Sequence, residues 1–360
     1  MRDLRRTLAV VAAMVVVTVV PTAAAEVAVQ SVAAASAPGV WSPVPAQDID
    51  EGQICPPSER TRFTDCRTNI YHWNIHKDDP VAGPIIGTLT ARLTLHATLA
   101  SNNKDWSATY SVFVWDATEA AAVGTTMSVV AECSGQCTVS ESPQGAQSVG
   151  KNSTVVGGVK FTASTAGQAT SRQKINLFFF NAAAVNSGTT TGDVNTELGP
   201  VRCDDAVAGE GNGGNGTPGC VMKEVPGMFQ INSPGCVGKG CVDHRAFVAR
   251  AQANPYTQKW GVLGAGKPLT RQVLPVRAQK SKRNKVCPPG FAKNPDQADL
   301  PQGARDSCDE YPFSSTYQGV PEFAVKEILP GWDNGEGGLQ VQDFYRVNHI
   351  LDGDPFYVVP

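Results

Sequence analysis

Residues 308–316, Cys-Asp-Glu-Tyr-Pro-Phe-Ser-Ser-Thr, hold the side chains whose types and spacing could most readily do chemistry. Two adjacent carboxylates, Asp309 and Glu310, follow a cysteine and shortly precede Pro312. A carboxylate that reaches a water molecule can act as a general base. Free aspartate, with a pKa of about 3.9, is a weak base; burial would raise that pKa and a nearby cation would lower it. Without further context the pair is more typical of a solvated turn, because proline restricts the residue before it and often marks a surface loop.

A second acidic run lies at the end of the chain. Residues 351–359 read Leu-Asp-Gly-Asp-Pro-Phe-Tyr-Val-Val. The carboxylates of Asp352 and Asp354 could bind calcium, which prefers oxygen ligands. An Asp-Gly-Asp run is more typical of a turn that leads into a strand.

The two runs together resemble the NucA/NucB family of secreted deoxyribonucleases, whose core carries a C-D-E-Y-P-F-x-S-T run and a D-G-D-x-F-Y-V ending. The resemblance extends from about residue 219 to residue 360 and includes the segments 218–221, 244–252 and 284–287. Residues before about 200 show no such resemblance. It implies an α+β nuclease domain with a ββα-type metal centre, which cuts DNA outside the cell.

The resemblance also implies roles for individual residues. Asp309 is the catalytic carboxylate, in the role that histidine plays in related ββα nucleases, and Glu310 matches the second acid of the motif. Neighbouring residues of a strand point to opposite faces, so the two acids cannot do the same job there. His244 lies in the matching region and could be a second base or a phosphate donor, although a histidine at a helix start is more often a cap or surface group.

The metal-side helix of the family corresponds here to residues 333–346. The family has Asn followed by Gln-Gly or Ala-Gly before this helix, whereas this chain inserts Gly335-Glu336 after Asn334. Asn334, Gln340 and Asp343 are the candidate ligands. Mg²⁺ or Mn²⁺ is the expected cofactor, with Ca²⁺ left open, since hard cations prefer oxygen ligands.

A basic segment at residues 267–295 contrasts with the formal net charge of −3 for the whole chain, because it holds eight Lys or Arg residues and no acid. On charge alone such a segment can be a solvated face. Beside a nuclease centre it favours contacts with DNA phosphates. The candidate DNA-binding residues are Lys280, Lys282, Arg283 and Lys285.

The first 25 residues have the pattern of a cleaved secretory signal: an Arg-rich start, an apolar stretch at residues 8–20 and alanines at residues 23–25. The apolar stretch is shorter than the roughly 20 residues that span a bilayer. We therefore expect a secreted, extracellular protein with no membrane partner after cleavage. Residues 26–50 resemble a flexible lead-in.

All ten cysteines lie beyond this signal, and an exported chain uses cysteines as disulfides. Nearest-neighbour pairing is a hypothesis, since spacing does not determine connectivity. The pairs are Cys55 with Cys66, Cys133 with Cys137, Cys203 with Cys220, Cys236 with Cys241, and Cys287 with Cys308. A zinc site is the alternative, but no C-x-x-C pair occurs. His72 and His76 have a spacing that suits zinc on a helix, but their segment alternates like a strand.

Two domains are expected. Residues 87–184 alternate polar and apolar residues in short runs separated by Gly, Asn and Ser, which predicts a β-sandwich domain at residues 51–205. A Gly-rich linker follows at residues 206–218, and residues 219–360 form the nuclease-like domain.

The second domain mixes helices and strands. A helix is expected at residues 242–253, with Asp243 placed to cap it. Strands are expected at residues 323–329 and 356–359, and a further helix at residues 339–351.

The leading hypothesis is a secreted, metal-dependent, non-specific DNA endonuclease, expected as a monomer, with Asp309 as general base. The sequence does not distinguish single-stranded from double-stranded substrates, or DNA from RNA. The alternative is a non-catalytic surface protein whose β domain binds cell wall or polysaccharide beside a degenerate nuclease domain. The Gly335-Glu336 insertion is the feature that favours this alternative.

Overall fold

The alternating segments of the N-terminal half form long antiparallel strands, as their sequence predicts. The computed structural model describes residues 55–77, 83–118, 125–134, 137–141, 145–163, 174–186, 189–197, 199–205, 218–231, 242–293, 295–301 and 305–360. These residues all belong to one unit of the chain. The signal and lead-in at residues 1–50 and most of the linker lie outside the described residues.

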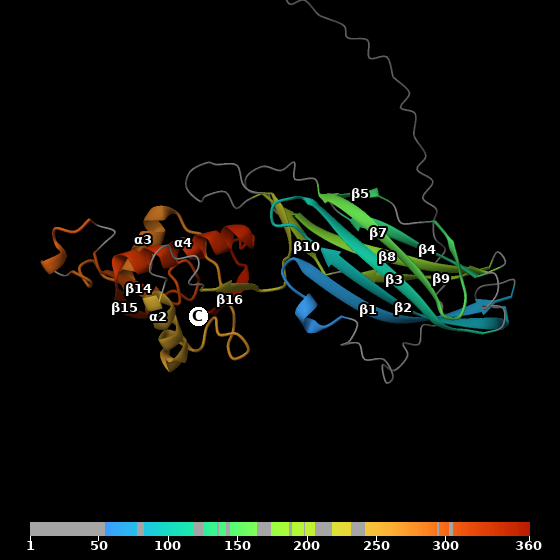
Figure 1. The fold of residues 1–360 in the computed structure, drawn as a ribbon, viewed down its shortest axis with the longest axis horizontal. Coiled ribbons are helices and arrows are strands. Elements are labelled where there is room, and N and C mark those ends of the chain that lie inside the picture. Colours follow the sequence, from blue (N-terminus) through green and yellow to red (C-terminus); the bar gives the residue numbers. More distant parts are fainter. Residues whose placement is uncertain are drawn as a thin grey trace, which may run out of the picture. The chain divides into compact units, whose positions relative to one another are not determined.

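Two sheets make up the N-terminal part, which is mostly β (Figure 1). The first, in spatial order, contains β1 (Thr64–His76), β2 (Ile85–Thr98), β3 (Asp105–Ala117), β7 (Ser153–Ala163) and β5 (Cys137–Glu141). The second contains β11 (Gly219–Met222), β10 (Val201–Asp204), β8 (Lys174–Asn186), β4 (Thr125–Ser134) and β6 (Gln147–Val149), and β9 (Thr189–Glu197) pairs with β8. A short 3₁₀ helix, η1 (Pro57–Glu59), precedes β1.

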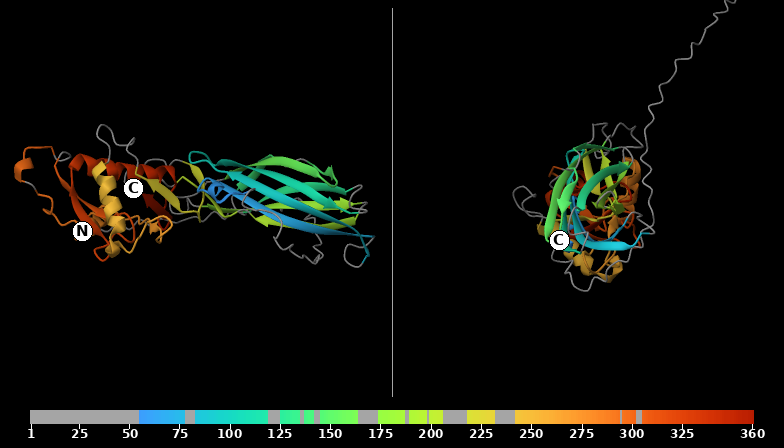
Figure 2. Two further views of the ribbon diagram at one scale, coloured as in Figure 1. Left: turned by 60° about the horizontal axis from the view of Figure 1, so that its bottom comes forward. Right: turned by 90° about the vertical axis from the view of Figure 1, so that its right-hand side faces the viewer.

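Side chains from both sheets share one hydrophobic core. Leu93 on β2 and Val112 on β3 are fully buried, and so are Met127 on β4 and Val201 on β10. The strands are long and twisted, and Figure 2 shows the curl of the sheets in two further views. The period-two pattern therefore identifies the inward face correctly.

The strand β11 lies in the second sheet, where it pairs antiparallel with β10. The residue pair Cys203 and Cys220 is directly opposed in this ladder and forms a disulfide. The expected boundary between residues 218 and 219 therefore does not coincide with the change of sheet. Sequence reasoning missed this because a four-residue strand carries too little periodicity to reveal its partner.

The C-terminal part mixes helices and strands (Figure 1). Their buried side chains form a second hydrophobic core. Its three-stranded sheet contains β12 (Gly227–Gln230), β16 (Pro355–Val359) and β13 (Leu269–Thr270), with β12 parallel to β16. A hairpin consists of β14 (Ser307–Tyr311) and β15 (Val325–Leu329). The helices are α2 (Val242–Ala253), α3 (Val276–Val286) and α4 (Gly331–Val347), with 3₁₀ turns η4 (Pro255–Thr257) and η5 (Pro295–Gln297).

The helix α2 has the bounds that the sequence predicts, but α4 does not. The expected helix at residues 339–351 begins eight residues earlier, at Gly331, and ends at Val347. The glycines in its first half each cost a helix about 1 kcal/mol relative to alanine, which argues against a helix there. Packing overrides that preference, because Asp333, Gly337 and Val341 form one buried stripe.

Four of the five expected disulfides are present: Cys55–Cys66, Cys133–Cys137, Cys203–Cys220 and Cys287–Cys308. The last of these fastens the end of α3 to β14. The fifth expected pair, Cys236 with Cys241, differs from the others, because both Cys236 and Cys241 lie outside the described residues. That bridge therefore stays a prediction.

Within the described part of the chain, no helix is both long and apolar enough to cross a bilayer.

Candidate active site

The strand β14 carries Asp309 and Glu310 toward opposite sides of the hairpin, and both are buried. Asp309 contacts α2, whereas Glu310 faces α3. The solvated-turn interpretation of this pair is therefore wrong. The two acids have different neighbours, as strand geometry requires.

Asp309 and His244 form a short hydrogen bond. His244 lies in the first turn of α2, and its Nδ1 donates to Asp309 Oδ2 at 2.6 Å. The other carboxylate oxygen, Oδ1, accepts the backbone N–H of Glu310 at 2.9 Å. A carboxylate at Nδ1 selects the tautomer in which Nε2 carries a lone pair, and it stabilises the imidazolium after Nε2 accepts a proton.

The Nε2 atom of His244 is buried, and no described residue forms a hydrogen bond with it. Buried polar atoms are nearly always paired, so an unpaired one has a specific reason. The ring of Phe313 lies nearly parallel to the imidazole, with centroids 6.2 Å apart. The imidazole therefore has an aromatic ring on one side and a carboxylate at Nδ1, and Nε2 is the ring nitrogen without a described partner.

Asp333 holds the helix that carries His244. Its Oδ1 accepts the backbone N–H of His244 at 2.8 Å, and its Oδ2 accepts that of Asp243 at 3.1 Å. Asp333 is fully buried. A carboxylate at these N–H groups caps the helix and complements its dipole. The sequence assigns the cap to Asp243, but α4 supplies it, because an acid distant in sequence packs against the start of α2.

Gly337 lies one turn after Asp333 on α4 and contacts the imidazole. A Cβ atom at this position would stand 2.7 Å from both Cγ and Cδ2 of His244. Only glycine allows α4 and the ring to approach so closely. Sequence reasoning missed Asp333 and Gly337, although an acid in a first helical turn and a glycine four residues later are a recognisable signal once the helix start is known.

Glu310 contacts the basic helix instead of the imidazole. Its Oε2 accepts from Arg283 Nε at 3.4 Å, while Arg283 Nη2 donates to the carbonyl of Cys308 at 2.7 Å. Burial raises the pKa of Glu310, and the charge of Arg283 partly opposes that shift. Glu310 thus links α3 to β14 from the face away from His244.

The four predicted DNA-binding residues differ in their surroundings. Lys280 and Lys285 are exposed, and Arg283 is exposed along its stem although its guanidinium contacts Glu310 and Cys308. Lys282 is half-buried; its Nζ donates to Gln272 Oε1 at 2.6 Å and to the carbonyl of Thr316. Burial lowers the pKa of Lys282 to about 8. The ammonium group of Lys282 is thus already bonded within the protein, whereas those of Lys280 and Lys285 are exposed; the DNA-binding role of all four residues stays a prediction.

Of the three predicted metal ligands, only Asn334 hydrogen-bonds to β14. Its Nδ2 donates to Ser307 Oγ at 2.7 Å and to the carbonyl of Cys308 at 3.0 Å. Asp343 is exposed and pairs with Arg346 at 2.5 Å. It follows Asn334 by nine residues, or about two and a half helical turns, and so lies on the opposite side of α4. Gln340 lies about 120° around the helix from Asn334.

The residues near Asp309 include oxygen donors of the type that a hard divalent cation prefers, but too few to complete its coordination shell. Within the described residues, the one group of three His, Cys, Asp or Glu ligand atoms lying within 4.8 Å of one another is Glu59, Cys66 and His96. Cys66 is in a disulfide, so that group offers no thiolate. Near β14 the available donors are the Asp309 carboxylate, the Asn334 amide oxygen and His244 Nε2. Mg²⁺ commonly binds through one or two protein oxygens, with water and phosphate completing its shell.

A model of the family described as deoxyribonuclease NucA/NucB matches residues 262–359, which is well under half of the chain. The C-terminal region is a NucA/NucB deoxyribonuclease domain. The match includes β14, β15, α4 and β16, and hence Asp309, Asp333 and Asn334. His244 lies before it. No curated protein and no solved structure matches the chain significantly.

The residues considered for a zinc or a calcium site form hydrogen bonds within the protein. His72 and His76 lie on β1, where Nδ1 of each pairs at 2.7 Å with Thr90 Oγ1 and the Gly83 carbonyl respectively. In the NucA/NucB domain, Asp354 binds two arginines, which supports the turn interpretation of the Asp-Gly-Asp run over a calcium site.

Proposed function

We propose that this protein is an exported deoxyribonuclease in which Asp309 and His244 act as one proton-transfer pair on a phosphodiester bond. The observation that carries the proposal is the 2.6 Å bond between His244 Nδ1 and Asp309, together with a buried His244 Nε2 that has no described partner. The match of residues 262–359 to a deoxyribonuclease family supports the reaction class.

In this proposal, Nε2 of His244 accepts the proton of the attacking water. Asp309 keeps the ring oriented and stabilises the imidazolium that results. The sequence assigns the base to Asp309 itself. Both Asp309 oxygens already accept protein hydrogen bonds, so the pair is a better unit of catalysis than the carboxylate alone.

A divalent cation, Mg²⁺ or Mn²⁺, is part of the proposal. When bound, it would supply charge neutralisation of the phosphate and stabilisation of the leaving oxygen. Asn334, through its amide oxygen, and Asp309 are the residues that would hold it. Phe313 stacks against the imidazole, and α4 approaches the ring closely at Gly337.

DNA is the proposed substrate, and the exposed Lys280 and Lys285 are the proposed phosphate contacts, with Arg283 reaching from the edge of the same helix. Four disulfides agree with a protein that acts outside the cell. We further propose a monomer, whose N-terminal β part could take a cell-wall or polysaccharide ligand.

Plasmid DNA incubated with the purified chain tests the proposal. We expect nicking with Mg²⁺ or Mn²⁺ that a chelator abolishes. His244→Ala should reduce the rate by roughly 10²–10⁴-fold, the usual contribution of a general base. Asp343→Ala is the matched acidic control on the far side of α4 and should cut at the wild-type rate. A folded wild-type chain that cuts DNA with neither metal, but binds cell-wall material, would support the non-catalytic alternative.

A further inference from the structure

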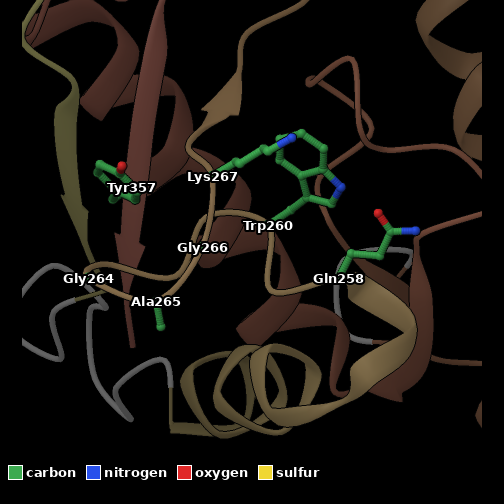
Figure 3. Close-up of a pocket in the computed structure, with 7 residues that line it drawn as sticks. All are labelled: Gln258, Trp260, Gly264, Ala265, Gly266, Lys267 and Tyr357. Atoms are coloured by element: carbon green, nitrogen blue, oxygen red, sulfur yellow. The ribbon is translucent and has the colours of Figure 1, made fainter.

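An open cavity lies in the loop region that follows α2. Its volume is about 590 Å³, and it is lined by Gln258, Trp260, the loop from Gly264 to Gly266, Lys267 and Tyr357 (Figure 3). It is separate from the residues of the Asp309–His244 pair. The lining combines an indole, an ammonium group, an amide and a phenol.

The loop is tied to the strands of the nuclease domain. The N–H of Gly261 donates to the Lys267 carbonyl at 2.8 Å, and the N–H of Val358 on β16 donates to the Gly261 carbonyl at 2.9 Å. The hydroxyl of Tyr311 donates to the Trp260 carbonyl at 2.8 Å. Tyr311 lies two residues after Asp309 on β14. The backbone of Trp260 is therefore held by the strand that carries the catalytic acid.

Trp260 and Lys267 are suited to a nucleotide. The Lys267 ammonium lies 5.8 Å from the centroid of the indole, and the two side chains lie side by side in Figure 3. Lys267 is exposed, while Trp260 is half-buried. Exposed contacts of a cation with an aromatic ring are weaker than base stacking on such a ring, so Lys267 can exchange the ring for a phosphate oxygen.

We propose that this cavity is a nucleotide subsite for DNA, in which Trp260 stacks on a base and Lys267 pairs with a neighbouring phosphate. The inference rests on the proposed function and extends it to a substrate class. A base inside a duplex already has neighbours on both faces, so only an unpaired base can stack on the indole. The subsite therefore favours single-stranded DNA.

Binding to the full chain in EDTA tests the subsite separately from cleavage. The probes are a short fluorescent oligothymidylate and a duplex of the same length, followed by fluorescence anisotropy. Trp260→Leu should weaken single-strand binding about tenfold, the range expected for loss of one stacked base. Trp260→Phe, which keeps an aromatic ring, should weaken it less than about threefold. Duplex binding should change by less than about twofold in both variants.

Matched controls keep the result specific. Tyr256, an exposed aromatic residue on η4 outside the cavity lining, should tolerate Tyr256→Leu without loss of binding. Lys267→Gln should weaken single-strand binding severalfold, whereas Lys151→Gln on the N-terminal β part should not. If Trp260→Leu fails to fold, Trp260→Phe and Lys267→Gln decide the question.

Equal losses for single strand and duplex in Trp260→Leu, or an unchanged affinity in Lys267→Gln, would overturn the subsite. A wild-type chain that binds the oligothymidylate through Trp260 but never cuts DNA would instead overturn the proposed function and leave the subsite standing. A chain that cuts DNA but binds no single strand contradicts the subsite alone.

Discussion

Asp309 gives both carboxylate oxygens to protein donors, His244 Nδ1 at 2.6 Å and the Glu310 N–H at 2.9 Å. At the scale of the residue, this explains why the acid that the sequence singles out is better seen as the partner of a base. The proton-accepting atom of the pair is His244 Nε2, which lies 65 residues away in sequence from the acid that orients the ring.

Asp309→Asn tests this division of labour. The amide can offer an N–H to Nδ1, which favours the tautomer with a proton on Nε2 and removes the accepting lone pair. We expect the cleavage rate at saturating DNA to fall roughly 10²–10⁴-fold with little change in KM. Steady-state kinetics on a labelled oligonucleotide measure both values. A variant that keeps more than half of the wild-type rate would contradict the assigned role of Asp309.

At the scale of the element, the helix α4 positions the helix α2. Asp333 caps α2 through two backbone N–H groups, and Gly337 makes room for the imidazole ring. One helix thus sets both the position and the orientation of His244. The glycines that weaken α4 as an isolated helix are what permit this approach.

Gly337→Ala and Gly338→Ala form a matched pair on α4. The first places a methyl group 2.7 Å from the ring of His244, while the second meets no atom within 4 Å. We expect Gly337→Ala to destabilise the protein by about 1–3 kcal/mol, as overpacking does, and to reduce cleavage. Gly338→Ala should stabilise it by up to about 1 kcal/mol with unchanged cleavage. Urea unfolding and nicking assays read out both; similar effects in the two variants would contradict the contact.

The helix α3 gives a second prediction at this scale. Lys280→Gln and Lys285→Gln should each reduce the dependence of log affinity on log salt by about 0.9, as the loss of one phosphate contact does. Lys282→Gln should leave that dependence unchanged, because its ammonium is bonded to Gln272 and Thr316. Lys282→Gln should instead lower the free energy of unfolding of the protein. Binding titrations at several salt concentrations in EDTA distinguish these outcomes.

At the scale of the whole molecule, a buried charged cluster joins residues of the β part to the end of the chain. Asp354 accepts from Arg62 Nη2 at 2.5 Å and from Arg202 Nη2 at 2.6 Å. His349 is fully buried between Asp204 Oδ1 and the Ser101 carbonyl, each 2.8 Å from a ring nitrogen. His349 thus bridges a carboxylate and a backbone carbonyl inside this cluster.

Asp354 makes the stability of the protein depend on pH in the acidic range. Burial on its own would raise the pKa of Asp354, but hydrogen bonds and charge from Arg202, with the charge of Arg62, outweigh burial and hold it below its ordinary value of 3.8. A carboxyl with a lowered pKa contributes stability that is complete above its ordinary pKa and is lost as pH falls below it. The protein should therefore lose stability on acidification below about pH 4.

Asp354→Asn checks this claim. At neutral pH it should destabilise the chain by about 3–5 kcal/mol, because it removes the carboxylate that pairs with buried Arg62 and one of the two carboxylates that pair with buried Arg202, which keeps Asp204. Between about pH 4 and pH 2 its stability should fall less steeply than that of the wild type. Urea unfolding over this pH range measures both effects. Exposed Asp343→Asn is the control, and a wild-type slope in Asp354→Asn would contradict the assignment.

Much of the local structure follows from the sequence alone. The period-two segments, the bounds of α2 and four neighbouring cysteine pairs are all as expected, because each depends on contacts between residues close in sequence or on one alternating face. The acid pair at residues 309 and 310 is likewise identifiable from its motif. The predicted start of α4 is wrong, because the low helix propensity of its glycines argued against a helix that tertiary packing stabilises.

Only the tertiary structure decided which residues meet. It paired His244 with Asp309, capped α2 with an acid 89 residues away, bonded Lys282 and Arg283 to groups of the protein itself, and separated Asp343 from Asn334. Local sequence patterns determine which face of an element is buried. They do not determine which other element covers that face, because that choice depends on packing between segments that are distant along the chain.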